Sequence, residues 1–526
     1  MERNIIIKDW SKIDITFGLI YPNIYEIGMS SYAIRLLYHL LNSNNNIACE
    51  RLFLPKSINY PASKDQTNKD DLRSIENKVL PEEFDILGFS VQYENDFKNI
   101  LWILEKAEIP LLRDERKFIN MNEKKNYPII IAGGSVITSN PLPLNLYFDL
   151  LFIGDSELSL SAFLSIFRRY KNNEISYSQL LDTIAHVEGI YVPSLNNNPK
   201  RVVLQDLDKS QILANQILSV NSNQKKIFQQ NFLLEINRGC PYKCKFCISS
   251  YHNSPFRNRS YKNIVETIES GIFKTKFDTI SLIGSCVSAH PKFIEICEYI
   301  INKGINLTIP SIRIEHINKK IIKILEKANI KTITIAPEAG SEKLRYEMGK
   351  LISNESIFSA IKQIKGSTIK NIKLYFLIGL PNEKDEDIRE LILFIKAINN
   401  IGFNKNSLRI NINPFIPKFN TPFAKSIDFL LDQNFGSFKK KYQKMEQELT
   451  NLPSIKLKFK NYKSIIKNAK LQALLSLGDQ EISTFLKSYY SNGAHFGALR
   501  RAQNELKFDI NEYFMKIKSG YHPWNF

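Results

Sequence analysis

Six short apolar segments, each followed by a helix-like stretch, recur between residues 230 and 415 and constrain the fold more than any other feature. The strand candidates are residues 232–236, 279–283, 307–309, 331–335, 372–378 and 408–412. Helix-like stretches fill the intervals, for example residues 262–273, 293–302 and 317–327. This alternation is typical of a (β/α) barrel, but it stops two units short of the usual eight. We therefore predict a partial (β/α)6 TIM barrel over residues 229–425.

A second, less regular alternation occupies residues 1–190. Its strand candidates are residues 13–20, 84–91, 128–132 and 150–154, and its helix-like stretches are 32–41, 96–106 and 157–170. This pattern predicts an α/β domain of the doubly wound, Rossmann-like kind. Ser90, Gly133, Gly134 and Gly154 follow its strands, at the edge where open sheets bind ligands, so we take them as candidate cofactor-binding residues. The alternative is that the glycines only make tight turns.

Two further regions complete the expected organisation. Residues 191–228 are polar and irregular, with Asn196–Asn198 and Asn221–Gln224, and we expect a linker there. Residues 426–526 are expected to form a small α+β C-terminal tail that caps the barrel or recognises substrate. Its helix candidates are residues 438–449, 463–477 and 480–490, and residues 455–460 alternate with the period of a half-exposed strand.

The chain carries a formal charge of +18, from 71 Lys and Arg against 53 Asp and Glu. Such a charge fits a polyanionic partner such as RNA, but Lys, Asn and Ile are abundant throughout, which also fits the codon usage of an A+T-rich genome. The run Lys439–Lys441 either contacts an anionic substrate or forms a solvated helix face.

No segment has the roughly 20 continuous apolar residues of a membrane span, so we expect a cytoplasmic protein.

Three of the six cysteines, Cys240, Cys244 and Cys247, lie within eight residues, directly after the first barrel strand. Thiolates are the ligands of iron–sulphur clusters, and three of them can hold three irons of a 4Fe-4S cluster and leave the fourth iron open. Structural zinc requires four ligands, and His252 would have to be the fourth. A disulfide would leave one thiol over. The loop position, where barrel active sites lie, favours the cluster.

The run Cys240-Pro-Tyr-Lys-Cys244-Lys-Phe-Cys247 on a six-unit barrel resembles the radical S-adenosylmethionine (SAM) superfamily. The resemblance implies an enzyme whose 4Fe-4S cluster binds and reductively cleaves SAM to a 5'-deoxyadenosyl radical. It also implies that Phe246 lies near the adenine, and that a reducing partner such as flavodoxin or ferredoxin supplies electrons.

Other positions at the strand ends match the places where the superfamily holds SAM. These are Gly284, Ser285, Ser311, Arg313, Glu338, Gly379 and Pro381. The resemblance assigns Gly284 to a turn that usually includes a glutamate, which is absent here. Glu338 would contact the methionine or ribose end of SAM, and Gly379 would lie along the adenine. For Arg313 and Glu338 the alternative is an internal ion pair at the barrel mouth.

Longer strings narrow the resemblance to a largely uncharacterised radical SAM group with a cobalamin-binding domain. The strings are Pro310–Arg313, Ala336–Gly340, Tyr375–Pro381, Asn413–Lys418 and Gln472–Leu475. Residues Tyr21–Glu26 lack the histidine with which many cobalamin domains ligate cobalt, so cobalamin would bind without it, or the domain is an empty relic. The group implies cobalamin-dependent methylation of an unactivated carbon. The alternatives are radical cyclisation, rearrangement or thiolation, or an RNA-binding protein with a structural cluster.

Overall fold

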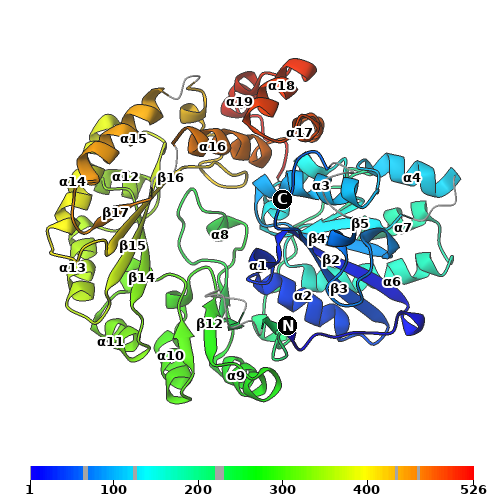
Figure 1. Ribbon diagram of the computed structural model, residues 1–526, viewed down its shortest axis with the longest axis horizontal. Coiled ribbons are helices and arrows are strands. Elements are labelled where there is room, and N and C mark those ends of the chain that lie inside the picture. Colours follow the sequence, from blue (N-terminus) through cyan, green and yellow to red (C-terminus); the bar gives the residue numbers. More distant parts are fainter. Residues whose placement is uncertain are drawn as a thin grey trace.

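A computed structural model describes residues 2–62, 69–122, 127–219, 230–432, 436–458 and 462–525. Two α/β units lie side by side, and a group of C-terminal helices lies across their junction (Figure 1). Asn221–Gln224 of the expected linker and residues 459–460 of the expected C-terminal strand lie outside the described residues. No helix in the described residues is long and apolar enough to cross a bilayer.

The N-terminal unit is built on one six-stranded sheet in the order β3-β2-β4-β5-β6-β7. Its elements are β2 (Ile15–Ile24), α1 (Tyr25–Gly28), α2 (Tyr32–Asn42), β3 (Ile47–Leu54), β4 (Ile86–Ser90), α3 (Phe97–Lys106), α4 (Arg113–Asn122), β5 (Ile129–Gly133), α5 (Ser135–Ser139), β6 (Leu150–Phe152), α6 (Ser156–Lys171), α7 (Tyr177–Ile184) and β7 (Ile190–Tyr191). All neighbours are parallel except β6 and β7. The strand order reverses between β2 and β4, which creates a binding crevice at their carboxyl ends.

This sheet is covered on both faces, which confirms the doubly wound prediction. Along β2, Phe17 and Leu19 pack with α2, α6 and α7, whereas Ile20 packs into a second core that contains α3. The alternation follows from the strand period of two. The sequence prediction did not include β3, which lies at the edge of the sheet beside β2.

The second unit is a partial barrel of seven parallel strands in two sheets, β13-β12-β9 and β14-β15-β16-β17. Its elements are β9 (Phe232–Glu235), β10 (Asn237–Arg238), α8 (Ile248–Tyr251), β11 (Arg257–Asn258), α9 (Tyr261–Thr275), β12 (Thr279–Ile283), α10 (Phe293–Asn302), β13 (Asn306–Thr308), α11 (Lys319–Lys327), β14 (Thr332–Glu338), α12 (Glu342–Glu347), α13 (Asn354–Lys365), β15 (Asn371–Ile378), α14 (Asp385–Asn399), β16 (Leu408–Pro414), α15 (Gly436–Leu449) and β17 (Ile455–Leu457). The six predicted barrel strands are all present.

The helices of the barrel follow local signals in the sequence. The amide of Asn318 accepts hydrogen bonds from the backbone N–H groups of Lys320 and Ile321 and so caps α11. In α11, Ile321 and Leu325 are buried while the lysines face solvent, as in an amphipathic helix that covers a sheet.

Two regions differ from the sequence interpretation. The segment 455–460 was assigned to the C-terminal tail, but β17 pairs in parallel with β16 and extends the barrel wall. Part of the expected linker forms β8 (Leu218–Ser219), which pairs with β1 (Glu2–Arg3). The domain boundaries at residues 190, 228 and 425 stay predictions.

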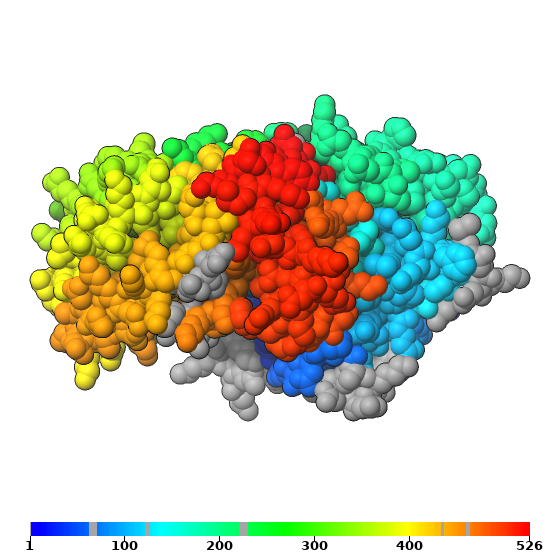
Figure 2. Space-filling view, turned by 90° about the horizontal axis from the view of Figure 1, so that it is seen from above, coloured from blue at the N-terminus to red at the C-terminus, as the bar shows by residue number. Residues whose placement is uncertain are grey.

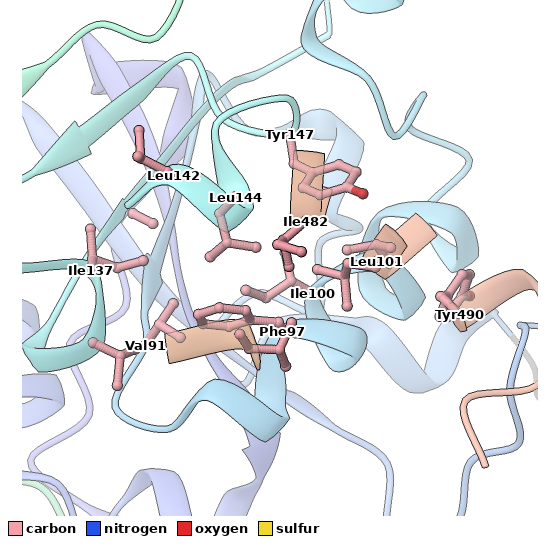
Figure 3. Packing of buried hydrophobic residues seen from close by; sticks show 14 of the residues in the cluster. Val91, Phe97, Ile100, Leu101, Ile137, Leu142, Leu144, Tyr147, Ile482 and Tyr490 are labelled. Carbon is pink, nitrogen blue, oxygen red and sulfur yellow. The ribbon is translucent and has the colours of Figure 1, made fainter. Parts of the chain in front are cut away.

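The C-terminal helices α16 (Tyr462–Ser476), α17 (Glu481–Ser491), α18 (Phe496–Leu506) and α19 (Ile510–Lys518) lie between the two units (Figure 2). Most of their buried apolar residues belong to the same core as α3 and one face of the N-terminal sheet, whereas Ile466 of α16 belongs to the barrel core. Ile482 of α17, for example, packs among Ile100, Leu101 and Leu144 (Figure 3). These helices therefore complete the N-terminal core, while α16 also packs against the barrel, and their expected role as a barrel cap or substrate-recognition element stays a prediction.

Candidate active site

The three clustered cysteines lie on a loop, residues 239–256, whose two ends are joined by the antiparallel ribbon β10–β11. Gly239 starts the loop with φ 78°, and a Cβ atom there would lie 2.3 Å from the carbonyl oxygen of Asn253, so only glycine fits. Within the loop, the N–H of Lys245 donates to the carbonyl of Met348 at 2.9 Å. The loop is thus fixed at the carboxyl edge of β9, at the barrel mouth.

The thiols of this loop differ in their environments. Cys244 is buried, and burial raises its pKa. A hydrogen bond from the Cys286 thiol lowers the pKa of the half-buried Cys240 to about 6. This hydrogen bond favours the thiolate form of Cys240, which is the form that binds iron. In the described residues no three Cys, His, Asp or Glu side chains converge on one point, as single-ion binding requires. An iron–sulphur cluster does not need such convergence, because each thiolate binds a different iron.

Two cations stand beside the cysteine loop. Arg313 Nη1 lies 3.9 Å from Cys244 Sγ, and the guanidinium lies 3.5 Å from the ring centre of Tyr242. Arg313 also pairs with Glu315, and Lys350 pairs with Glu338 at 3.2 Å. The internal ion pairs considered for Arg313 and Glu338 are therefore present. Both cations still favour negative charge on the loop, since electrostatic attraction from Lys350 and Arg313 opposes the rise in the pKa of Cys244.

The predicted SAM-binding residues are distributed around the same mouth. Phe246 packs against a small apolar cluster that includes Ala339 and Leu380, the neighbours of Glu338 and Gly379 in the chain. Gly284 follows β12, and a Cβ atom there would meet the amide of Asn237 at 2.2 Å. Arg313 stands at the loop itself, whereas Ser311 is exposed to solvent. Ser285 lies between Gly284 and the buried Cys286, and Pro381 follows Leu380.

Glu383 holds the Gly379–Pro381 turn from within the protein. Its carboxylate accepts hydrogen bonds from the N–H of Gly379 at 3.0 and 3.1 Å and from Lys441 Nζ at 2.6 Å. Burial raises the pKa of Glu383, which Lys441 opposes. Lys441 is thus part of this internal ion pair, while Lys439 and Lys440 are exposed. Neither this ion pair nor the exposure of the other two lysines places the Lys439–Lys441 run in a substrate site.

A cavity of about 650 Å³ opens at the carboxyl edge of the N-terminal sheet. All four residues predicted there, Ser90, Gly133, Gly134 and Gly154, line it. At Gly134 and Gly154 the backbone has positive φ, and a Cβ atom would lie 2.1 and 2.0 Å from the carbonyl oxygens of Val91 and Val202. These two glycines are therefore required by the protein's own turns, and they border the cavity as a consequence.

The loop after the first strand of this sheet contains no histidine, and its polar groups bind other parts of the protein. Asn23 donates to Asp96 at 2.9 Å, Tyr25 binds Glu2, and Glu26 pairs with Lys56 at 3.1 Å. Tyr21 is the residue of this loop region that lines the cavity. His252, which was considered as a zinc ligand, also lines the cavity and lies 2.7 Å from the carbonyl oxygen of Phe419 through Nε2. Burial lowers its pKa to about 4.

An ion-pair network that the sequence did not reveal joins this cavity to the cysteine loop. Asp155 accepts from Arg238 at 2.8 Å and from Arg257 at 2.6 Å, and these arginines are opposite each other in the β10–β11 ribbon. Arg238 also pairs with Glu157 and Glu235, at 3.0 Å each. Burial would raise the pKa of Asp155, but the two guanidinium groups hold it below its usual value. The partners are far apart in sequence, so no local signal could have indicated them.

Family models match both units of the chain. The model described as "Radical SAM proteins, N-terminal" matches residues 33–193, and that of the radical SAM superfamily matches residues 234–395. The uncharacterised protein MJ0966 of Methanocaldococcus jannaschii is 30% identical over 89% of this chain and 90% of its own length. The chain belongs to the radical SAM superfamily.

Two solved radical SAM enzymes resemble the fold of this chain over almost its whole length. The methyltransferase TsrM of Kitasatospora setae, solved with cobalamin and a [4Fe-4S] cluster, matches 95% of this chain and 99% of its own, with 12% identity and a TM-score of 0.52. OxsB, solved with aqua-cobalamin and SAM, matches 96% of this chain and 72% of its own, with 14% identity and a TM-score of 0.51. At these identities the likeness establishes the fold of this radical SAM enzyme.

The other three cysteines lie in different elements of this radical SAM enzyme. Cys49 lies in β3, Cys297 is buried in α10, and Cys286 stands alone beside Cys240. Among the described residues, which include every cysteine, these three do not converge with other metal-binding side chains on one point. The thiolation alternative, which often needs a second cluster, gains no support.

The Asp155 network leads to a prediction for the cluster of this enzyme. Asp155→Asn keeps the side-chain volume but leaves one arginine without its anionic acceptor, so we expect the loop to loosen. Loss of cluster iron to a chelator should become about tenfold faster, as for other supporting partners of metal ligands. The matched control is Asp149→Asn, which also breaks a buried pair in this domain, with Arg116 at 3.3 Å, but touches neither loop nor cavity. Equal rates in both variants would contradict the prediction.

Proposed function

We propose that this radical SAM enzyme methylates an unactivated carbon with the help of SAM, a 4Fe-4S cluster and cobalamin. One observation carries the proposal: the N-terminal cavity is closed on one side by the cysteine-loop unit. Arg238, His252 and Asn253, from the ends of the loop, line the same cavity as Ser90 and Gly133. A cofactor in the cavity would therefore border the radical-forming site without any further domain movement.

The residues present fit a cluster with bound SAM. Cys240, Cys244 and Cys247 would hold three irons, and the low pKa of Cys240 suits a thiolate ligand. Gly284, Ser285, Ser311, Arg313, Glu338, Gly379 and Pro381 are proposed to surround SAM, with Phe246 beside its adenine. When bound, the cluster supplies the electron that cleaves SAM. Arg313 would stabilise the negative charge of the reduced site and hold the loop through Tyr242.

The cavity also fits cobalamin. Its inner part is apolar, with Phe17, Leu19, Leu36 and Ile131 in the walls, which suits a flat aromatic base, and its rim is polar. Cobalamin, when bound, supplies the carrier of the methyl group. Since no histidine follows β2, cobalt would receive no ligand from Tyr21–Glu26. A reducing partner such as flavodoxin or ferredoxin is also proposed.

The proposal predicts products that separate it from other radical chemistry. Cluster-reconstituted enzyme loaded anaerobically with cobalamin, and given a methyl-accepting substrate, should release both 5'-deoxyadenosine and S-adenosylhomocysteine. Formation of 5'-deoxyadenosine alone would indicate rearrangement or cyclisation instead. Retention of the cluster with no uptake of cobalamin under any loading condition would overturn the proposal.

A cavity-filling variant tests the location of cobalamin. Gly133 has ordinary φ, and its added Cβ would meet Phe152 at ordinary contact distances, its Cβ at 3.4 Å and its carbonyl oxygen at 3.9 Å, so Gly133→Leu should fold. Its side chain would fill the cavity and lower cobalamin affinity by at least about tenfold, measured by absorbance titration. Gly133→Ala should weaken binding less, and Gly366→Leu, at an exposed helix end, should bind like the wild type. Unchanged binding in Gly133→Leu would place cobalamin elsewhere.

A further inference from the structure

The strands β14 to β17 turn one face toward the barrel helices and the other toward the barrel interior. On β15, Ile372, Leu374 and Phe376 are buried in the core shared with the helices. Lys373 and Tyr375 alternate with them and stay partly exposed. The strand period of two therefore assigns Lys373 to the interior face.

Three cations stand side by side on this interior face. Lys373 pairs in register with Arg409 of β16, and Arg409 pairs with Lys456 of β17. Neighbouring strands are about 4.8 Å apart, so the three side chains start from adjacent positions. Thr334 is the register partner of Lys373 on β14. The same strand alternation gives the other sheet Ser281 and Thr308 on its interior side, where their hydroxyl oxygens are 2.5 Å apart.

In the part of the chain that the structure describes, none of these three cations forms an ion pair. Two carboxylates of the barrel mouth, Glu235 and Glu338, are already paired with Arg238 and Lys350. Like charges directly opposite each other on neighbouring strands destabilise a sheet. A bound anion would remove that repulsion, whereas water leaves it in place.

We propose that Lys373, Arg409 and Lys456 bind an anionic group of the substrate, a phosphate or a carboxylate. The proposal rests on the proposed function only in taking the ligand to be the substrate of the radical reaction. The arginine supplies a planar pair of donors for two oxygens, and the lysines supply charge.

The position of Lys373, Arg409 and Lys456, called the cation row below, adds a constraint on the shape of the substrate. Lys373 lies about 16 Å of extended strand before Ile378, where the predicted SAM turn begins. A substrate that binds to the cation row and reacts at the barrel mouth must therefore be elongated. Its anionic end lies deep in the barrel, and its reacting carbon lies near Gly379 and the cysteine loop.

The alternative explanation for lysines here is edge protection. β17 is the edge strand of its sheet, and exposed lysines on an edge prevent pairing with other chains. That accounts for Lys456 but not for Lys373, which lies two strands inward. The two explanations predict different results when charge is removed from the inner strands. Anion binding predicts a loss of anion affinity, whereas edge protection predicts no change in it.

The test uses the full chain without cluster or cobalamin, so that its outcome does not depend on the radical reaction. Inorganic pyrophosphate and tricarballylate are titrated calorimetrically into the wild type and into Lys373→Gln/Arg409→Gln. The control, Lys323→Gln/Lys440→Gln, removes the same charge from exposed helix positions. We expect saturable binding to the wild type and control, at least about tenfold weaker in the interior variant. Binding of pyrophosphate would indicate a phosphate group on the substrate, and binding of tricarballylate would indicate a carboxylate.

Thermal melting without anion gives a second, independent readout. Because repulsion is removed, the interior variant should melt about 1–3 °C higher than the control. Equal anion affinity in the interior and control variants, or absence of saturable binding of either anion to the wild type, would overturn the proposal. Unchanged anion affinity in the interior variant, together with aggregation of a Lys456→Gln variant, would establish edge protection instead. Failure of cobalamin loading, by contrast, would leave this result intact and affect only the proposed function.

Discussion

Cys244→Ala is expected to abolish the cluster and, with it, the cleavage of SAM. Cys244 is the most buried of the three loop thiols, and the positive charges of Arg313 and Lys350 stabilise its thiolate. With two thiolates remaining, the loop cannot hold three irons. Iron content after anaerobic reconstitution should fall from about four per chain to background. The cluster absorbance at ~400 nm should vanish, and 5'-deoxyadenosine should not form.

Cys297→Ala is the matched control for this experiment. Cys297 is also buried, in α10 of the same barrel, but does not lie on the loop. It should keep its iron and its 5'-deoxyadenosine formation. If Cys244→Ala retained a redox-active cluster, the assignment of the loop as the cluster site would be wrong. Cluster loss in Cys297→Ala as well would show only that the barrel tolerates no change in its core.

Ile482→Ala is expected to destabilise the N-terminal domain, although residue 482 is distant from it in sequence. Ile482 is fully buried among Ile100, Leu101 and Leu144 (Figure 3). Truncation of such a side chain costs about 2–5 kcal/mol, because it removes apolar contacts and leaves a cavity. Urea unfolding followed by tryptophan fluorescence measures this loss where it occurs, because Trp102 and Trp524 lie in this core and Trp10 packs against it.

Met515→Ala on α19 is the control, since Met515 is half exposed and its truncation should change stability by less than about 0.5 kcal/mol. An unfolding midpoint of the tryptophan signal that is equal in Ile482→Ala and the wild type would show that the C-terminal helices do not support the domain. The cobalamin cavity would then be expected to form without them.

The sequence predicted the barrel well because its signals are local. Each barrel strand is a short apolar run with a following amphipathic helix, and all six were found. The cysteine spacing placed the loop, and the small residues after the N-terminal strands placed the cavity edge. These features depend on residues that are close together in the chain.

β3 was missed because charges interrupt its apolar pattern. Glu50 and Arg51 lie in the middle of the strand, yet both are buried. Arg51 pairs with Glu2 at 2.7 Å and Glu76 at 2.8 Å, and Glu50 accepts from Trp10 at 2.7 Å. Buried charges are tolerated when they are paired, but partners so distant in sequence cannot be recognised from a single chain.

The same limit applies to the site and to the C-terminal region. The period-two pattern around Ile455 correctly indicated a strand, but not that its partner is β16. The strings that contain Lys418 and Gln472 gave no reason why those residues belong together. In the structure both bind Glu94, next to the cavity edge, Gln472 at 3.0 Å. Asp155 and its arginines are a further example of contacts that only the tertiary structure reveals.

The sharing of one core by the N-terminal sheet and the C-terminal helices has a consequence for biosynthesis. The strands and α3 leave the ribosome first, but the helices that cover their apolar face are made more than 300 residues later. At about 5–20 residues per second, the ribosome needs roughly 15–60 s for that interval. During this time the nascent domain exposes a face that includes Ile100 and Leu144. Chaperone binding during translation is therefore expected to concentrate on this face and to end when α17 emerges.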